Sequence, residues 1–243
     1  MHKAQELYPL PAEERTAVVK ATVLSEAIWL AVALVGGAML NGLRSDDWLG
    51  ALALNWLPDL TGALTLHWVA LPMAALMVAV AELLQRVAEA RSESFRAARR
   101  KINQGINGEL PRVDLGRICL CMGLAGIAEE LVFRYVVIGL LMLGLTQMLP
   151  YTAAALATLA IQSVAFWLVH LEYRDPWIST ITLCDAAILG AGYLLTNSLL
   201  SCMIAHAAYN VITLLLDRRR MVKDPNYFGG PAPTSYVRDL SAK

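Results

Sequence analysis

The longest stretch of this chain without Asp, Glu, Lys or Arg covers residues 135–171. Drawn as one straight helix it would extend about 55 Å, far beyond the ~30 Å hydrocarbon core of a bilayer. We therefore predict two membrane crossings here, separated by a break at residues 147–152, where Pro150 cannot continue a helix. Because lipid offers the backbone no hydrogen-bond partner, segments of this length are expected to cross it as helices.

Other stretches are nearly as free of charge. Residues 27–43 and 61–81 carry none, and residues 176–216 carry only Asp185, with a turn expected at residues 196–198. Residues 46–58 are apolar but short, which indicates an interfacial or re-entrant segment. We predict an all-α polytopic transmembrane bundle of about six spans, at residues 22–41, 61–84, 118–147, 151–171, 178–195 and 199–216.

Composition agrees with a membrane protein. Hydrophobic residues make up 57% of the chain and charged residues 16%, against roughly 45–50% and about 25% in soluble domains. This excludes an ordinary soluble domain and a disordered chain. The formal net charge of zero provides no attraction to nucleic acid, so no nucleic-acid partner is expected.

The basic residues predict the orientation. They gather at residues 86–117, at residues 218–223, in the first 21 residues (Lys3, Arg15 and Lys20) and at Arg174. The opposite loops hold only Arg44. Since basic residues concentrate on the cytoplasmic side, six crossings place both termini in the cytoplasm. We divide the chain into a cytoplasmic N-terminal segment (1–21), two spans with a basic loop (22–114), a four-helix core (115–217) and a flexible cytoplasmic tail (218–243).

Two carboxylates and a guanidinium interrupt the third predicted span. A charged side chain at bilayer depth costs about 2.5 kcal/mol or more, so Glu129, Glu130 and Arg134 need a physical reason to lie there. Glu130 and Arg134 are spaced i,i+4 with the acid first, the favourable order for a helical ion pair. Glu129 projects about 100° away around the helix and is therefore expected to face another polar group.

Two other predicted spans carry polar side chains at helical spacing. Phe166 and His170 share one face near the end of the fourth span, and His206 and Asn210 share one face of the sixth. Polar faces within a bilayer turn toward one another or toward a water-filled cavity. Hydrogen bonding between helices would explain a single histidine, but the whole set favours a functional site.

Three motifs in this order resemble those of a known family. Glu-Glu-x-x-x-Arg at 129–134, Phe-x-x-x-His at 166–170 and His-x-x-x-Asn at 206–210 resemble the motifs of the CAAX protease and bacteriocin-processing membrane proteins, relatives of the type II CAAX prenyl endopeptidase. The resemblance covers about residues 115–217. It implies a glutamic intramembrane protease, without a cofactor, whose site opens toward the cytosol.

The resemblance also implies a role for each motif residue. Glu129 would be the general base that activates water, and His170 would hold and polarise that water. His206 and Asn210 would stabilise the oxyanion that forms at the peptide carbonyl.

Three further residues would have supporting roles. Glu130 would be the second carboxylate and Arg134 its partner, while Phe166 belongs to the second motif. The expected partners are the lipid bilayer and a peptide or protein substrate at the membrane, whose identity stays open. The short loops favour an integral protein of the bacterial inner membrane.

Two alternatives remain open. Two Glu and two His could bind Zn in a zinc-dependent membrane hydrolase, although the helical His-Glu-x-x-His signature is absent. A non-catalytic scaffold or transport-like protein could instead use a polar path. Asp185, His67, Glu26 and Glu82 would mark that path, but we expect a structural role for Asp185 and expect Glu26 and Glu82 to reach water near span ends.

The depths of the motif residues pose one problem. Counted from Arg117, Glu129 would lie about 18 Å deep, whereas His170, counted from Arg174, would lie about 6 Å deep. We therefore expect residues 115–126 to bend or to start at a shallow angle, because three glycines make this segment pliable.

Overall fold

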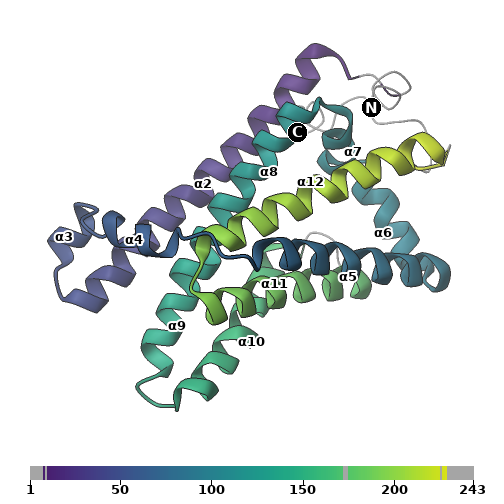
Figure 1. The fold of residues 1–243 in the computed structure, drawn as a ribbon. Helices are drawn as coiled ribbons and strands as arrows, with labels where there is room; N and C mark the ends of the chain where they lie inside the picture. The colour runs from purple at the N-terminus through teal and green to yellow at the C-terminus, as the bar shows by residue number, and fades with distance from the viewer. Residues whose placement is uncertain (1–7, 9, 172–174, 225, 229–243) are drawn as a thin grey trace.

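The computed structural model describes residues 8, 10–171, 175–224 and 226–228, which form helices and no strand (Figure 1). The predicted all-α polytopic bundle is therefore confirmed, while the six spans and the cytoplasmic termini stay predictions. Lys3 and Arg174, on which part of the orientation rests, lie outside these ranges. Five helices of the described chain are long and apolar enough to cross a membrane: α2 (Ala12–Ser45), α5 (Ala70–Arg91), α10 (Tyr151–Val169), α11 (Pro176–Thr196) and α12 (Leu199–Lys223).

The predicted span 118–147 consists of three consecutive helical pieces. The α-helix α8 (Leu115–Glu130) continues into a π-helix, η2 (Leu131–Val137), and then into α9 (Ile138–Leu145). Residues 115–126 are continuously α-helical, so the expected bend or shallow start stays a prediction, and the departure from α geometry follows Glu130. Such π segments are frequently found at functional sites.

The second predicted span begins too early. Residues 61–84 were expected to be helical, but α4 (Leu57–Ala63) ends at Ala63 and α5 starts at Ala70. The intervening loop is bound to the start of α12, where Ser201 Oγ accepts a 2.7 Å hydrogen bond from the His67 backbone N–H. Uncharged residues thus form a loop here because side chains of another helix satisfy its backbone.

The short apolar segment after α2 forms two small helices, α3 (Trp48–Leu52) and α4, beside the end of α2 (Figure 1). Asp47 caps α3 by accepting a hydrogen bond from the Gly50 N–H. Trp56, between these two helices, is buried. Its ring packs directly against Gly37 of α2, where a Cβ would overlap the ring, so Trp56 anchors α3 and α4 to α2. Whether they lie at the membrane surface stays a prediction.

Both predicted breaks in the long uncharged runs are confirmed. α9 ends at Leu145 and α10 starts at Tyr151. Between α11 and α12, Asn197 adopts the left-handed conformation (φ 52°) and Ser198 caps α12 through the Ser201 N–H.

The last helix is longer than expected. α12 continues to Lys223, so the tail does not start at residue 218 as predicted. Tyr227 and Phe228 are buried against Met221. Residues 225 and 229–243 of the predicted flexible tail lie outside the described part of the chain.

Short helices connect α5 to α8. They are α6 (Glu93–Asn103), α7 (Ile106–Glu109) and the 3₁₀-helix η1 (Leu110–Arg112). Asp114 then caps α8 through the Arg117 N–H. This hydrogen bond, together with the Arg117 guanidinium, lowers the pKa of the Asp114 carboxyl because both favour its charged form.

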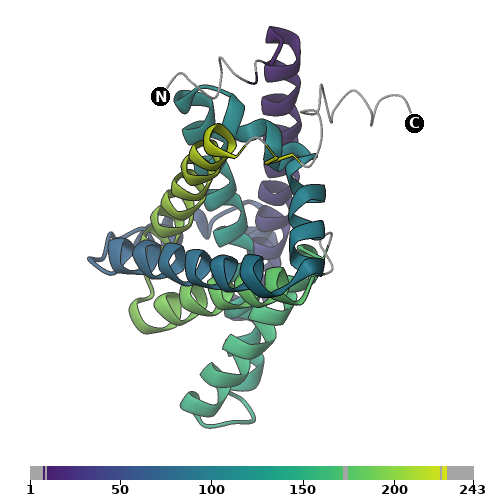
Figure 2. The ribbon, with the colours of Figure 1, turned by 90° about the vertical axis from the view of Figure 1, so that its right-hand side faces the viewer.

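The helix α8 packs against both α2 and α12, and α5 and α11 run beside each other (Figures 1 and 2). Gly126 permits the close approach of α8 to α12. A Cβ at Gly126 would lie 2.9 Å from the Met203 carbonyl oxygen and 3.1 Å from the Ala207 nitrogen. Since backbone cannot move aside as a flexible side chain can, this contact fixes how near Glu129 and Glu130 come to His206.

Gly126→Ala is therefore expected to destabilise the protein by about 1–3 kcal/mol, because the new methyl group would force two helices apart. Gly123→Ala is the matched control, since a Cβ there meets nothing within 4 Å. Alanine is the better helix former by up to about 1 kcal/mol, so the control is expected to be neutral or stabilising. Thermal unfolding in detergent, followed by circular dichroism, measures both; equal midpoints for the two variants would contradict the close contact.

Candidate active site

Glu130 lies at the centre of a fully buried charge cluster. Its Oε2 is 3.0 Å from Arg134 Nε, and neither side chain is exposed to solvent. Its Oε1 is 2.8 Å from Nδ1 of His206 on α12. The expected i,i+4 ion pair is therefore present, and it extends to a second helix. Glu130 Oε1 is hydrogen-bonded, and Oε2 makes an ion pair with Arg134 without hydrogen-bond geometry, so the buried carboxylate balances the charge of Arg134.

Phe166 connects this cluster to His170. The Arg134 guanidinium lies 5.1 Å from the centroid of the Phe166 ring, within the range of a cation–π contact. The same ring stacks on the His170 imidazole, with centroids 4.4 Å apart and planes inclined by 24°. His170 Nδ1 is also 2.7 Å from the Phe166 carbonyl oxygen. The second motif thus holds His170 by its ring and by a hydrogen bond.

Glu129 has a different environment from its neighbour Glu130. Its Oε2 is 3.8 Å from His170 Nε2 and 4.0 Å from His206 Nε2, both longer than a hydrogen bond. This oxygen is buried and has no hydrogen-bond partner among the described residues. A buried carboxylate oxygen without a partner is costly, so a small polar molecule is the natural complement of this position.

The partners of the two histidines assign their protons. A carbonyl oxygen only accepts, so His170 carries a proton on Nδ1 and its Nε2 is a free acceptor when the ring is neutral. His206 Nδ1 donates to Glu130 in the same way. His206 Nε2 can then donate only when the ring is an imidazolium, a form that the Glu130 carboxylate stabilises.

All four residues predicted to be catalytic line one cavity of about 260 Å³: Glu129, His170, His206 and Asn210. Helices α8, α10 and α12 each contribute to it. Phe95, Ile178 and Ile181 supply apolar wall, and the His170 side chain is 39% exposed. The cavity thus combines a buried polar end with an apolar wall and access from outside.

Two further acidic residues lie near this cavity, and one of them was misjudged from the sequence. Asp185 lines it together with Tyr209 of α12, and its side chain is buried. Glu26 lines an adjoining cavity of about 420 Å³ that also includes Glu129 and Asn210. The expectation that Glu26 reaches water near a span end is wrong: α2 begins at Ala12, Glu26 is 6% exposed, and its Oε2 has no partner within the described structure. The sequence did give a signal for Asp185, because it is the one charged residue in the otherwise uncharged run 176–216.

The other ionisable residues of the predicted polar path lie elsewhere. Glu82 makes two 2.7 Å hydrogen bonds with Arg220. The backbone of His67 pairs with Ser201, and neither His67 nor Glu82 lines the two cavities around Glu129. Within the described ranges, no group of three or more His, Cys, Asp or Glu side chains is arranged to hold a metal ion.

Comparison with known proteins locates the family resemblance. Residues 112–212 match the family model described as type II CAAX prenyl endopeptidase Rce1-like. Comparisons with curated proteins and with solved structures found no match. The matched segment contains all three motifs and nearly coincides with the predicted core at 115–217. The predicted resemblance is thereby confirmed: over residues 112–212 this chain resembles the Rce1-like type II CAAX prenyl endopeptidases.

Proposed function

We propose that the protein is an intramembrane endopeptidase in which Glu129 activates water to hydrolyse a peptide bond. The observation that carries this proposal is the unpartnered Oε2 of Glu129, 3.8 Å from His170 Nε2 and 4.0 Å from His206 Nε2. These gaps are too long for direct hydrogen bonds and suit a bridging water, which needs two or more polar partners.

The proton positions support one orientation of that water. Its two hydrogens donate to Glu129 Oε2 and to His170 Nε2, both of which are acceptors, and its oxygen lone pair then faces the substrate. When the oxygen attacks the peptide carbonyl carbon, Glu129 takes one proton as general base. The protonated Glu129 later delivers this proton to the departing amine nitrogen, so the carboxylate is restored and no covalent intermediate forms.

The oxyanion formed by this attack needs hydrogen-bond donors. Asn210 supplies its side-chain amide, and the His206 imidazolium supplies Nε2–H. Both line the cavity beside Glu129, one helical turn apart on α12. Glu130 and Arg134 act through His206 as positioning residues: they hold its ring and favour its charged form.

The substrate class follows from the surroundings of the cavity. The apolar helices that form its walls support a membrane-associated peptide or protein, and the family resemblance supports endopeptidase chemistry. The basic helix α6 contributes Phe95, Arg99 and Ile102 to the wall. Since basic residues favour the cytoplasmic side, we infer that the site opens toward the cytosol, in a bacterial inner membrane.

Glu129→Gln should lower the rate of peptide cleavage by about 10²–10⁴-fold, because the amide cannot accept the proton of water. Glu89→Gln, at an exposed glutamate outside both cavities, should cleave normally. Peptidomics of membranes from cells that carry each form identifies the substrate, and the purified protein then gives rates. Cleavage by Glu129→Gln at the wild-type rate would exclude the mechanism, and loss of bound zinc and activity to a chelator would favour the zinc alternative.

Asn210→Ala should reduce kcat by about 10²–10³-fold with little change in KM, because the amide contributes only once the oxyanion has formed. Thr16→Ala is the control and should leave kcat unchanged, because this exposed threonine lines neither cavity around Glu129 and its hydroxyl bonds to the Ala12 carbonyl oxygen. Rates on the identified peptide separate the two. A pure KM effect of Asn210→Ala would instead indicate a role in substrate binding.

Glu130→Gln should destabilise the fold by about 3–5 kcal/mol, because it leaves the fully buried Arg134 without its counter-charge. The adjacent Glu129→Gln should leave stability unchanged or slightly raised, since Glu129 Oε2 has no partner to lose. Thermal unfolding of both variants in detergent provides the measurement. If both variants unfold at the same temperature, the two glutamates do not have the separate roles assigned here.

A further inference from the structure

A second cavity lies at the other end of the π-helix and does not share any lining residue with the cavities around Glu129. Its volume is about 650 Å³, and its walls come from the end of α2, from α3 and α4, from η2 and from α11. Arg44, the one basic residue of the loops predicted to lie opposite the cytoplasm, belongs to this wall. The proposed hydrolysis does not use this cavity.

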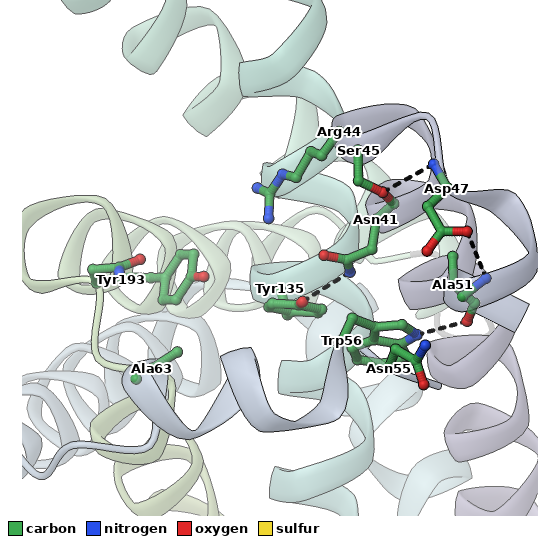
Figure 3. A pocket seen from close by; sticks show the side chains of 13 residues that line it. Asn41, Arg44, Ser45, Asp47, Ala51, Asn55, Trp56, Ala63, Tyr135 and Tyr193 are labelled. Carbon is green, nitrogen blue, oxygen red and sulfur yellow. Dashed lines mark hydrogen bonds between the residues drawn. The ribbon is translucent and has the colours of Figure 1, made fainter. Parts of the chain in front are cut away.

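Arg44 provides an uncompensated positive charge. It is exposed, and among the acidic side chains that the structure describes, which do not include that of Asp59, none forms an ion pair with it. Figure 3 shows its guanidinium directed into the open space between Tyr193 and the pair formed by Asn41 and Tyr135. Asp47 also lines the cavity, but its carboxylate caps α3 through the Gly50 N–H and lies on the side away from the guanidinium (Figure 3).

Two tyrosine hydroxyls add hydrogen-bond donors. The Asn41 side-chain amide donates one hydrogen to the Gly37 carbonyl oxygen at 2.8 Å and the other to Tyr135 Oη at 3.0 Å. Tyr135 Oη therefore accepts from Asn41 and keeps its own hydrogen for the cavity. The Tyr193 hydroxyl has no hydrogen bond within the described structure, and it points into the same space (Figure 3).

The wall is held in place before any ligand arrives. The Trp56 ring stacks on Tyr135, with centroids 5.7 Å apart and planes inclined by 18°. Its indole N–H donates to the Ala51 carbonyl oxygen at 3.1 Å. A fixed set of neutral donors around an arginine suits an anion with several oxygens, and arginine binds phosphate through paired hydrogen bonds.

The surroundings indicate how such a phosphate arrives. Leu49 and Leu52 on α3 are 82% and 70% exposed. Arg44 also lies just beyond the predicted span 22–41, at the level where lipid headgroups begin. Acyl chains can therefore lie against the apolar residues while the phosphate reaches the guanidinium.

We propose that this cavity binds the phosphate of a membrane phospholipid through Arg44, Tyr135 and Tyr193. Free inorganic phosphate shares the chemistry that Arg44 recognises, but it would leave most of the cavity and the adjoining apolar surface unused. The site is distinct from the proposed protease site, so its existence does not depend on proteolysis.

The test titrates the full-length protein in detergent with three probes: phosphatidylglycerol, a galactosyl diacylglycerol with the same acyl chains, and inorganic phosphate. Native mass spectrometry counts bound molecules, and the thermal midpoint reports stabilisation. Phosphatidylglycerol is expected to bind and raise the midpoint, and the phosphate-free lipid is not. Equal binding of both lipids would overturn the proposal. If inorganic phosphate raises the midpoint as much as phosphatidylglycerol at the same concentration, the bound phosphate does not come from a lipid and the proposal is overturned.

Variants then locate the bound lipid. Arg44→Gln should weaken phosphatidylglycerol binding by about tenfold or more, and Tyr193→Phe, which removes only a hydroxyl, by about threefold. Arg86→Gln removes the same charge from a side chain that is 77% exposed and outside this cavity, and should change binding by less than about twofold. Unchanged binding by Arg44→Gln, or an equal loss in Arg86→Gln, would contradict the site. If Arg44→Gln does not fold, the test rests on Tyr193→Phe: weaker phosphatidylglycerol binding supports the site, and unchanged binding contradicts it.

Discussion

The fully buried cluster of Glu130, Arg134 and His206 is the interaction on which the active-site geometry depends. A charge without a partner is costly at bilayer depth, so the ion pair and the 2.8 Å contact to His206 must form together. This requirement joins the end of α8 to the N-terminal third of α12, and Gly126 allows the two helices to approach closely enough. Cation–π contact with Phe166 then extends the cluster to α10 and fixes His170.

The same cluster separates the roles of two adjacent glutamates. Glu130 balances buried positive charge through Arg134 and His206, whereas Glu129, one position earlier, has its Oε2 3.8 Å and 4.0 Å from two imidazole nitrogens, too far for a direct hydrogen bond. An acceptor that is held near two histidines without a direct hydrogen bond is well suited to bind and deprotonate water. The π-helix that starts after Glu130 carries Arg134 and Tyr135, so one irregular segment contributes to the proposed active site and to the Arg44 cavity.

The sequence predicted the helical bundle, its two internal breaks and the convergence of three motifs, because uncharged runs and i,i+4 spacing follow directly from the physics of lipid and helix. It did not predict the loop before Ala70, because a run without charge does not distinguish helix from a backbone that Ser198 and Ser201 satisfy. It misjudged Glu26, because burial of that side chain depends on where α2 starts. The π-helix was also missed, since neither an uncharged run nor i,i+4 spacing distinguishes it from an α-helix.

The most direct test of the central claim is a crystal structure of the protein in which ordered water is visible. We expect one water within about 3 Å of both Glu129 Oε2 and His170 Nε2, with His206 Nδ1 bound to Glu130. A Glu129 carboxylate in direct contact with His170, or turned out of the cavity with no water between it and the histidines, would contradict the account.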